Sequence, residues 1–397
     1  MSNQNQSIKI VIAGDLCLRN ISSKINAESS EQMLQSIQPV LQQADFRIIN
    51  LENPLTSVTN PIDKSGPNLK GLPENICFLE AGHFDCAIIA NNHLGDFGFK
   101  GVTDTLDILE CKGIGHAGGG RNLDESYQPW IADKNGIRVA VIATAENEYG
   151  GANEKKPGMA GFSLGKLAES IEKAKQTADF VIVIVHGGNE YNPLPSPNVV
   201  ERYRLIARLG SDAVIGMHPH CPQGFETFRN KPIVYSTGNF LFYNEHNQDE
   251  RSSWYYGYLP VLTCQEGKGI SLEVVPYRFD PDCTRISPFS GHENEKMMAY
   301  LENLSSLFQD PVVNAAYFNG WCLLHGPQNA SKLVFRSEYL HDPECVHNLD
   351  FLILRNLLTC EAHHEVMANL MRLIENGQIE SSSRIAEEIR RLQKMPV

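Results

Sequence analysis

The sequence predicts an α/β protein, in which a largely buried, layered sheet is followed by a helical appendage at the C-terminus. Three observations predict this class. Short β-branched runs alternate with helical patterns through the first two thirds of the chain. Polar side chains follow five of these runs directly, and ligands collect at the carboxyl ends of strands in open α/β sheets. From about Pro281 the pattern becomes helical only.

The elements of the α/β part are expected in a regular order. Apolar runs predict strands, and periodic patterns between them predict helices. The expected strands are Ile8 to Ala13, Phe46 to Asn50, Asp85 to Ala90, Arg138 to Ala143, Phe180 to Val185, Asp212 to Gly216 and Ile233 to Ser236. The expected helices are Glu31 to Gln43 with an interruption near Pro39, Pro73 to Gly82, Gly101 to Lys112, Leu164 to Gln176 and Asn198 to Leu209.

The last third of the chain begins with a pair of strands and continues with helices. Tyr256 to Thr263 and Gly269 to Pro276 are joined by a polar turn and are expected to pair antiparallel. Beyond Pro281, the expected helices are Glu293 to Gln309, His347 to Glu375 and Ile379 to Lys394, with a mixed stretch around Trp321. Because no low-complexity linker precedes them, residues 281–397 are expected to pack on the main domain, residues 7–280.

Composition and charge exclude several classes of protein. A hydrophobic fraction of 42% and a charged fraction of 20% exclude wholesale disorder and fibrous chains. The formal charge of -13 argues against electrostatic binding to nucleic acid or anionic lipid. No secretory signal is visible, and no apolar run approaches the roughly 18 residues that span a bilayer. The 10 cysteines form no CxxC pair and are expected to be reduced thiols in a cytoplasmic protein.

The polar residues after the strands are of the types that bind a divalent transition metal. They are Asp15, Asn50 to Asn53, Asn91 to His93, His186, and the pair His218 and His220. Carboxylate, amide oxygen and imidazole together suit Mn, Fe or Zn, whereas Mg and Ca prefer oxygen alone and structural Zn prefers thiolates. The proline between His218 and His220 disfavours helix, and extended backbone would place both imidazoles on one side. The simplest interpretation is a hydrolytic metal centre.

Each of these residues also has an ordinary structural interpretation. Asp15 alone is more often a helix cap, Glu52 alone a surface charge, and asparagines such as Asn91 commonly form turns. Their co-occurrence at strand ends is what favours the metal centre. The structural interpretation is preferred for three other features: His363 and His364 on a solvated helix face, Cys17 as a packing residue, and Asn244 to Trp254 as a solvated loop rather than the lip of a pocket.

Taken in order, the motifs resemble those of one bacterial family. They are Gly14-Asp15, Asn50-Leu51-Glu52, Ala90-Asn91-Asn92-His93 with Asp96 and Gly98, His186-Gly187-Gly188 with Glu190-Tyr191, Gly216 to His220, and Tyr235 to Phe240. This ordered set closely resembles the bacterial capsule-synthesis CapA family, also called the poly-γ-glutamate synthesis protein family, over roughly residues 7–277. The resemblance implies a calcineurin-like metallophosphatase fold, a four-layer α/β/β/α sandwich with a metal centre between its sheets.

The resemblance also implies a role for each residue of the site. It implies one or two divalent ions, Mn, Fe or Zn, with Asp15 and His220 on the first, Glu52 bridging, and Asn92, His186 and His218 on the second. His93 would be the catalytic acid that protonates a leaving group, and Asp96 would orient its imidazole. Positions that would bind substrate are Asn53, Asn91, Glu190, Tyr191 and Asn239.

Two departures from the family bear on function. Metallophosphatases carry a histidine two residues after the first aspartate, where this chain has Cys17, so a single ion is one alternative. Capsule proteins of the family are often membrane-anchored, and no anchor is expected here. Two functions follow as alternatives: a metal-dependent hydrolase of a phosphoester or γ-glutamyl amide, or a non-catalytic accessory protein that binds an anionic capsule polymer. The expected partner is a small molecule or an anionic polymer, not nucleic acid or a membrane, and no protein partner is indicated.

Overall fold

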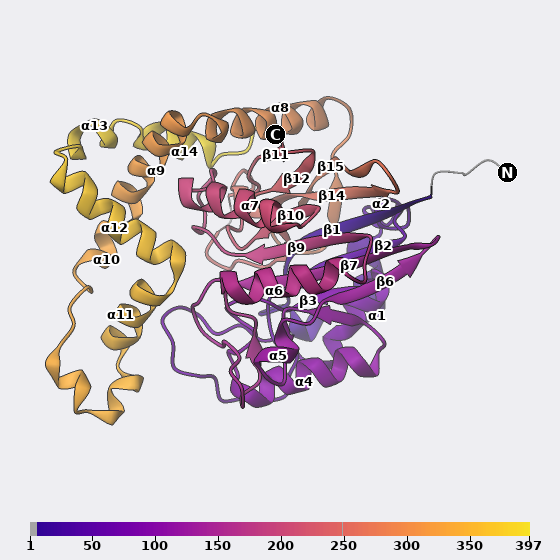
Figure 1. Cartoon of the computed structure of the whole chain (residues 1–397), viewed down its shortest axis with the longest axis horizontal. Helices are drawn as coiled ribbons and strands as arrows, with labels where there is room; N and C mark the ends of the chain where they lie inside the picture. Colours follow the sequence, from indigo (N-terminus) through magenta and orange to yellow (C-terminus); the bar gives the residue numbers. More distant parts are fainter. Residues whose placement is uncertain (1–5, 248) are drawn as a thin grey trace.

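Two β-sheets lie face to face with helices on both outer sides in the computed structural model, which describes residues 6–247 and 249–397 (Figure 1). The first sheet has eight strands in the order β16-β15-β14-β1-β2-β3-β4, and β13 pairs with the end of β1. These strands are β1 (Ser7–Cys17), β2 (Phe46–Leu51), β3 (Cys86–Ile88), β4 (Gly115–Ala117), β13 (Asn239–Phe242), β14 (Tyr256–Gln265), β15 (Gly269–Phe279) and β16 (Ile286–Pro288). β1 to β4 run parallel, and the expected antiparallel pairing of β14 with β15 is confirmed.

The second sheet has six strands in the order β11-β12-β10-β9-β7-β6. They are β6 (Trp130–Lys134), β7 (Ile137–Ala145), β9 (Phe180–His186), β10 (Ala213–Met217), β11 (Phe225–Phe228) and β12 (Lys231–Val234). A small third sheet joins β5 (Gly119–Gly120) to β8 (Gly158–Met159). β7, β9 and β10 are parallel neighbours, so their carboxyl ends lie at one edge of the sheet.

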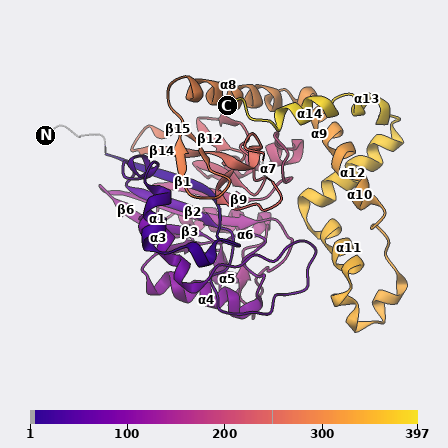
Figure 2. The ribbon, with the colours of Figure 1, turned by 180° about the vertical axis from the view of Figure 1, so that it is seen from behind.

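Helices cover the outer face of each sheet, as Figures 1 and 2 show from opposite sides. They are α1 (Ala27–Leu34), α2 (Gln38–Leu41), α3 (Cys77–Ala81), α4 (Gly98–Cys111), α5 (Leu123–Ser126), α6 (Leu164–Lys175) and α7 (Pro197–Leu209), with short 3-10 turns at Ser22–Lys24, Pro73–Ile76 and Ser253–Tyr255. Leu167 of α6 and Tyr203 of α7 pack on the second sheet. Phe78 of α3 and Leu106 of α4 belong to the apolar cluster of the first sheet. The expected four-layer α/β/β/α sandwich is confirmed.

Helix α7 shows how local sequence sets the limits of an element. Ser196 caps its start, because its hydroxyl oxygen accepts a hydrogen bond from the Val199 N–H at 3.2 Å. Pro197 occupies the first turn, where no N–H partner is needed. Gly210 follows the last turn with a φ of 125°, a conformation that glycine adopts without strain. These residues set the two ends of α7, so the loop between β9 and α7 consists of residues 187–196.

The helical appendage follows β16; its first helix runs along the sandwich over β11 and β15, and the later helices lie beside one end of the sandwich (Figures 1 and 2). Its elements are α8 (Gly291–Gln309), α9 (Pro311–His325), α10 (Pro327–Ala330), 3-10 turns at Ser337–Leu340 and Pro343–His347, α11 (Leu349–Thr359), α12 (Glu361–Glu375), α13 (Ile379–Ser383) and α14 (Ala386–Leu392). The chain end returns to the sandwich, where the Met395 N–H donates to the Arg251 carbonyl at 3.0 Å. Within the described ranges, no helix combines the length and apolarity needed to cross a membrane.

Three details of the appendage differ from expectation. The single helix expected from Ile379 to Lys394 is wrong, because the structure has two short helices there, α13 and α14. β16 pairs with β15, with Ile286 opposite Phe279, so the first sheet continues beyond Pro281. The single helix expected from His347 to Glu375 is wrong, because Cys360 has extended backbone (φ -77°, ψ 127°) and separates α11 from α12. No glycine or proline marks this break, so the helical pattern runs through it.

Candidate metal centre

Four strand ends bring the expected ligands together where the two sheets meet. β1 carries Asp15, which lies in register with Asn50 of β2, two residues before Glu52. β9 ends at His186, and β10 ends one residue before His218. Because neighbouring strands in each set are parallel, their carboxyl ends lie together. The position of each polar cluster directly after a strand therefore assembles the site.

The carboxylates and imidazoles form two groups that share Glu52. In the first group, His220 Nδ1 lies 3.4 Å from Asp15 Oδ2, and His220 Nε2 lies 3.5 Å from Glu52 Oε1. In the second group, His186 Nε2 lies 3.8 Å from Glu52 Oε1 and 3.1 Å from His218 Nδ1. The ligand atoms of each group lie within 4.8 Å of one another. Two groups of potential ligand atoms thus lie side by side and share one carboxylate.

The Glu52 carboxylate indicates most directly that the site fits a cation. Both of its oxygens are buried, and neither has a hydrogen-bond partner among the described residues. Burial raises the pKa of Glu52 well above its usual range, although His220 opposes this effect. A buried carboxylate without a partner is costly, and coordination to a cation removes that cost. The donor set of carboxylates, imidazoles and an amide oxygen fits a divalent transition metal.

The surroundings of His186 keep its ring neutral and oriented. Burial and the neighbouring His218 lower the pKa of His186 well below its usual value, so the ring is in the form that binds metals. Asn92 Oδ1 lies 3.2 Å from His186 Nε2 and adds an amide oxygen to the second group. The Asn50 amide donates to Asp15 Oδ1 at 2.7 Å and lies 3.3 Å from His186 Nδ1. Asn50 thus holds a residue of each group in place.

His220 is oriented by a different amide. Its Nδ1 lies 2.9 Å from the Asn239 side-chain oxygen, which can only accept, so Nδ1 carries the proton. Nε2 is left as the ligand atom, on the side of Glu52. Although burial opposes it, Glu52 and Asp15 raise the pKa of His220 to about 10. A bound cation would therefore replace a proton on this ring.

The backbone of the His218-Pro219-His220 segment is not extended. His218 has a φ of 98° and His220 a φ of 55°, so the expectation that extended backbone places both rings on one side is wrong. The left-handed backbone at both residues brings the two rings together instead, with their centroids 5.8 Å apart. The His218 N–H donates to Asp15 Oδ2 at 3.1 Å. Such strained backbone persists where surrounding contacts hold it, and it concentrates at functional sites.

His93 faces the same centre from the loop after β3. Its Nδ1 lies 2.7 Å from Asp96 Oδ2, and its Nε2 lies 4.0 Å from Glu52 Oε1. Asp96 is buried and also accepts from Lys64 Nζ at 2.6 Å and from the Leu69 N–H at 2.7 Å. Burial and Lys64 lower the pKa of His93. A neutral His93 therefore donates from Nδ1 to Asp96 and directs its free Nε2 at the centre.

The centre opens into a cleft of about 850 Å³ between the sandwich and the appendage. Side chains on the sandwich side include Lys64, His93, Glu190, Tyr191, Asn244, His246 and Trp254. Side chains on the appendage side include Trp321, His325, Leu357, His363 and Met367. Part of the loop Asn244 to Trp254 therefore forms the lip of a pocket. This is the alternative to the solvated loop that is preferred from the sequence. The solvated helix face expected for His363 is wrong, whereas His364 is exposed.

Two of the five positions expected to bind substrate line the cleft. They are Glu190 and Tyr191, and the Tyr191 ring stacks on Trp254 with centroids 5.8 Å apart. The structure does not bring the other three to the cleft, because their amides serve the buried framework. Asn53 accepts from the Leu18 N–H, Asn91 donates to the Leu51 carbonyl, and Asn239 holds His220.

Sequence patterns did not indicate two charged residues at the centre. Lys64 lies in the long loop after β2 but 13 residues beyond the end of that strand, so the strand-end pattern does not mark it. Glu148 accepts from the Asn92 amide at 3.0 Å. It follows β7 by three residues, just as the other polar clusters follow their strands, so the same strand-end rule could have found it.

Cys17 occupies the position at which the resemblance to metallophosphatases implies a histidine. Its side chain is buried, and burial raises the pKa of the thiol well above its usual range. The thiol is therefore protonated and packs as a small apolar group. Among the described residues, the first group of ligand atoms consists of Asp15, Glu52 and His220.

The fold and the site together define a class of protein, a four-layer α/β/β/α sandwich with clusters of potential metal ligands at its strand ends. The chain belongs to the family described as bacterial capsule synthesis protein PGA_cap, which matches residues 9–244. The family expected from the motifs is thus confirmed. The match ends before the appendage begins.

Several curated proteins are similar to this chain. The capsule biosynthesis protein CapA of Bacillus anthracis is 28% identical over 249 residues, which are 60% of this chain and 61% of that protein. The PGA biosynthesis protein CapA of Bacillus subtilis is 28% identical over 58% of this chain and 62% of that protein. A protein of Mycobacterium tuberculosis described as a probable polyglutamine synthesis accessory protein is 27% identical over 68% of this chain and 74% of its own length. The chain thus spans about three fifths of the length of the two CapA proteins.

Two solved structures are among those similar to this chain. The crystal structure of a phosphatase from Mycoplasma pneumoniae has a TM-score of 0.45 and 16% identity, and covers 70% of this chain and 97% of that one. The crystal structure of a 5′-nucleotidase from Candida albicans has a TM-score of 0.39 and 12% identity, and covers 79% of this chain and 57% of that one.

Proposed function

We propose that this protein is a metal-dependent hydrolase, and the Glu52 carboxylate is the observation that carries the proposal. Its two buried oxygens accept no hydrogen bond from the described residues and lie where two groups of potential ligand atoms meet. A carboxylate that binds two cations at once needs oxygens that are free of hydrogen bonds and close to the other ligands of both ions. The residues proposed to hold the ions are Asp15 and His220 on one side and Asn92, His186 and His218 on the other. The mixture of imidazole and oxygen donors favours Mn, Fe or Zn.

The chain itself supplies orientation and proton transfer. A bound divalent ion supplies Lewis-acid polarisation and lowers the pKa of water from 15.7 toward about 7. His93 directs Nε2 at the centre, 4.0 Å from Glu52 Oε1, and is proposed to pass a proton to the leaving group after taking one up at that nitrogen. Asp96 holds the opposite side of the ring, and Lys64 fixes Asp96. Asp96 and Lys64 are therefore positioning residues.

We propose a phosphoester or a γ-glutamyl amide as the substrate. Each presents an oxygen that a cation can polarise, beside further negative charge. Arg19 lines the cleft and provides local positive charge in a chain of net charge -13, whereas Lys64 and His363, which also line it, pair with Asp96 and Glu148. Relatives named for capsule and PGA biosynthesis favour an acidic polymer, or a small precursor of one.

The proposed location is the cytoplasm. All ten cysteines, which lie within the described ranges, are free. Free buried thiols are typical of proteins in a reducing compartment. The negative net charge also favours a small molecule or an anionic polymer held by local cations over nucleic acid as the ligand. Fractionation of the native cells followed by immunodetection measures the compartment directly.

Metal content per chain tests the hydrolase proposal. Protein purified without a chelator is expected to hold one to two equivalents of a transition metal by mass spectrometry. His218→Ala should lose metal because it removes an imidazole from the second group. His292→Ala on α8, whose side chain is 78% exposed, is the matched control and should retain it. Absence of bound metal even after reconstitution with Mn or Zn contradicts the proposal.

Turnover tests the role of His93. With phosphoesters and γ-glutamyl peptides as substrates, His93→Ala is expected to lower kcat by about 100-fold or more, because it removes a proton-transfer group. Its metal content should remain that of the wild type, since the ring is not proposed as a ligand. A variant that loses folding and metal together would show that His93 is structural instead.

A second candidate function is a non-catalytic accessory protein that binds an anionic polymer. Cys17 favours it, because the first group of ligand atoms lacks a donor at that position. A relative described as an accessory protein favours it as well. This candidate predicts that polyglutamate binds equally well before and after chelation, without turnover. Binding that requires metal and is followed by cleavage contradicts it.

A further inference from the structure

A second cluster of metal-binding side chains lies where α12 of the appendage meets the sandwich. Cys360 directly precedes α12, and His363 lies in its first turn. Side chains three residues apart at a helix start lie on the same side of the helix. Both face Glu148, which lies in the loop after β7. The cluster thus joins two segments that are distant in the sequence, since Glu148 and Cys360 are 212 residues apart.

The two separations from Glu148 in this cluster are close to those around one metal ion. His363 Nε2 lies 3.5 Å from Glu148 Oε1, and Cys360 Sγ lies 3.7 Å from the same oxygen. All three ligand atoms lie within 4.8 Å of one another. Tetrahedral zinc has bonds of about 2.3 Å to sulfur, 2.0 Å to nitrogen and 2.0 Å to oxygen, which place its ligand atoms about 3.3 to 3.6 Å apart. The observed distances to Glu148 correspond to edges of such a tetrahedron.

We propose that Glu148, Cys360 and His363 form a separate site for a thiolate-binding divalent metal of the zinc class. Sulfur and imidazole donors select zinc-like ions over Mg and Ca, which prefer oxygen alone. Glu148 and His363 also line the cleft, so the fourth position of the ion faces the cleft. On binding, the metal–sulfur bond forms as the Cys360 S–H bond breaks, and the proton passes to solvent.

This site would connect the appendage to the first metal centre. The other Glu148 oxygen, Oε2, accepts from the Asn92 amide at 3.0 Å, and the opposite atom of that amide faces His186. Arg355 of α11 donates to the Glu148 backbone carbonyl at 2.8 Å. Metal at Glu148 therefore fixes a side chain that orients Asn92. The break between α11 and α12 at Cys360 allows its thiol to reach this position.

Cobalt titration tests the site with a signal that only a cysteine ligand produces. Cobalt-loaded wild-type protein is expected to show a thiolate-to-cobalt charge-transfer band in the near ultraviolet. Cys360→Ser should remove the band and about one equivalent of bound metal. His363→Ala should weaken zinc binding at this site by about 10-fold or more, because even residues that only hydrogen-bond to a metal ligand contribute about 10-fold to affinity. The matched control is His364→Ala, because His364 is the exposed neighbour on the same helix.

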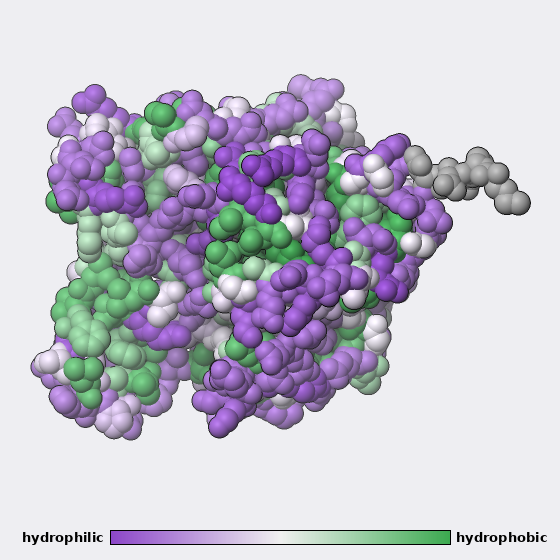
Figure 3. Space-filling view, viewed as in Figure 1, coloured by the Kyte–Doolittle hydropathy of each residue, from purple (hydrophilic) through white to green (hydrophobic). Residues whose placement is uncertain are grey.

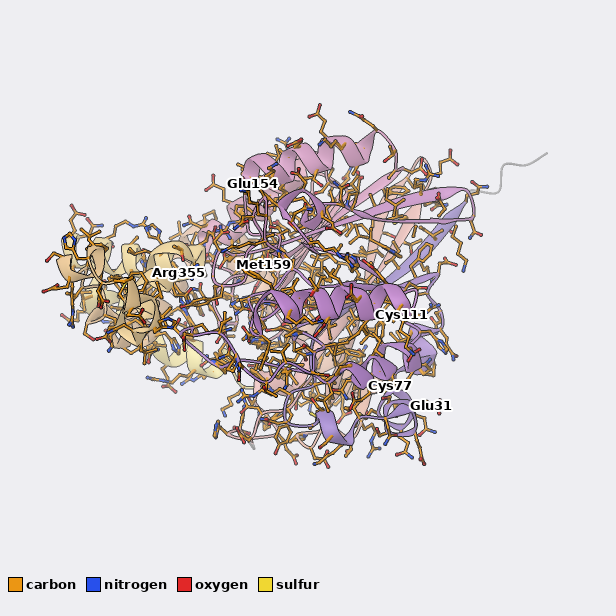
Figure 4. All side chains as sticks on the ribbon, turned by 90° about the horizontal axis from the view of Figure 1, so that it is seen from below. Glu31, Cys77, Cys111, Glu154, Met159 and Arg355 are labelled. Atoms are coloured by element: carbon orange, nitrogen blue, oxygen red, sulfur yellow. The ribbon has the colours of Figure 1, made fainter. Side chains whose placement is uncertain are left out.

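Two further cysteine variants exclude other sources of the band. Cys17→Ser tests the thiol beside the first centre, and Cys111→Ser tests an exposed thiol on the side of the sandwich away from the appendage (Figure 4). Both should retain the band. His218→Ala should also retain it while losing metal from the first centre, so failure of this site and failure of the hydrolase proposal are distinguishable.

Three results would overturn the assignment. They are cobalt bound without a charge-transfer band, a band that survives in Cys360→Ser, and a band that disappears in Cys17→Ser. X-ray absorption at the zinc edge of the wild-type protein needs no variant, and is expected to show a sulfur neighbour at about 2.3 Å, at less than one per zinc if zinc also fills the first centre. Zinc-loaded protein without a sulfur neighbour would show that Glu148 and His363 form only an ion pair.

Discussion

The sandwich and the appendage differ in how completely each buries its own apolar side chains. A continuous apolar cluster extends through the first sheet to the facing side of the second. The appendage has a smaller core, made of Phe318, Trp321, Cys322, Leu357, Val366, Met367 and Ile389. Of the large apolar side chains exposed in the described ranges, five precede residue 291 and ten follow it. In Figure 3, hydrophobic atoms gather over the part of the appendage that carries α11.

This difference indicates that the sandwich is stable by its own core, whereas the appendage depends on docking. Docking is apolar along α8, where Met297 and Leu301 belong to the apolar cluster of the sandwich, and polar beside the cleft. The Asn147 amide donates to Glu361 Oε1 at 2.6 Å, and Arg355 donates to the Glu148 carbonyl at 2.8 Å. Arg355 lies on the appendage where it meets the sandwich (Figure 4). The same junction forms the cleft, so the stability of docking and the shape of the candidate site are coupled.

The largest expected effect is on the core of the sandwich. Phe240 is fully buried, and its ring packs against Phe84 and Tyr277 with centroid separations of 6.0 and 5.6 Å. Phe240→Ala should lower the free energy of unfolding by about 3 to 5 kcal/mol, because it leaves a cavity in a close-packed core. Chemical denaturation measures this change. A loss below about 1 kcal/mol would contradict the conclusion that this core supplies most of the stability of the sandwich.

A substitution in the core of the appendage should act locally. Trp321 is 3% exposed and stacks on His325 with ring centroids 3.8 Å apart. Trp321→Ala should destabilise the appendage by about 3 kcal/mol and raise hydrogen exchange there. Amides of β9 and β10 should keep their protection. Equal loss of protection in those strands would show that the two regions unfold as one unit.

A substitution at the junction should weaken docking without unfolding either region. Arg355 also lies over the Tyr149 ring, 4.7 Å from its centroid. Arg355→Ala should cost about 1 to 3 kcal/mol, the range for a hydrogen bond made by a charged group. Limited proteolysis of the appendage should accelerate. The control is Arg384→Ala, whose side chain is 76% exposed, and an equal acceleration there would argue against a specific junction.

The smallest expected effect is a pH dependence at the edge of the junction. His347 Nδ1 lies 2.6 Å from Asp63 Oδ2, and this hydrogen bond raises the pKa of His347. The folded protein therefore binds the proton more tightly than the unfolded chain does. Its contribution is present below pH 6.5 and is lost as the pH rises through the higher folded pKa. Hydrogen exchange of residues 343–347 at pH 6 and pH 8 measures it.

A matched variant isolates this ion pair from other titrating groups. Asp63→Asn removes the charge that raises the pKa of His347, so the difference between pH 6 and pH 8 in protection, the exchange rate relative to the intrinsic rate at the same pH, should disappear. Because both side chains are 61% exposed, high salt should also reduce the difference. A pH dependence that persists unchanged in Asp63→Asn would assign it to another group.

Much of the sandwich and its site could be predicted from local patterns. The run Phe180 to Val185 predicts a strand because it is buried on both faces, and the polar His186 marks its end. The same rule places Asp15 and Glu52 at the centre. By contrast, β4 has three residues, Gly115–Ala117, and carries no recognisable period. The break at Cys360 lacks the glycine or proline that usually signals one.

The sequence by itself determined the order of strands and helices, the family, and the polar residues that follow each strand. Only the tertiary structure decided which of these residues meet and how they are oriented. Asn239 selects the ligand nitrogen of His220, and Asn147 meets Glu361 across 214 residues of chain. The physical reason is that residue periodicity reports the burial of one element at a time. Contacts between distant segments depend instead on how complete elements pack against one another.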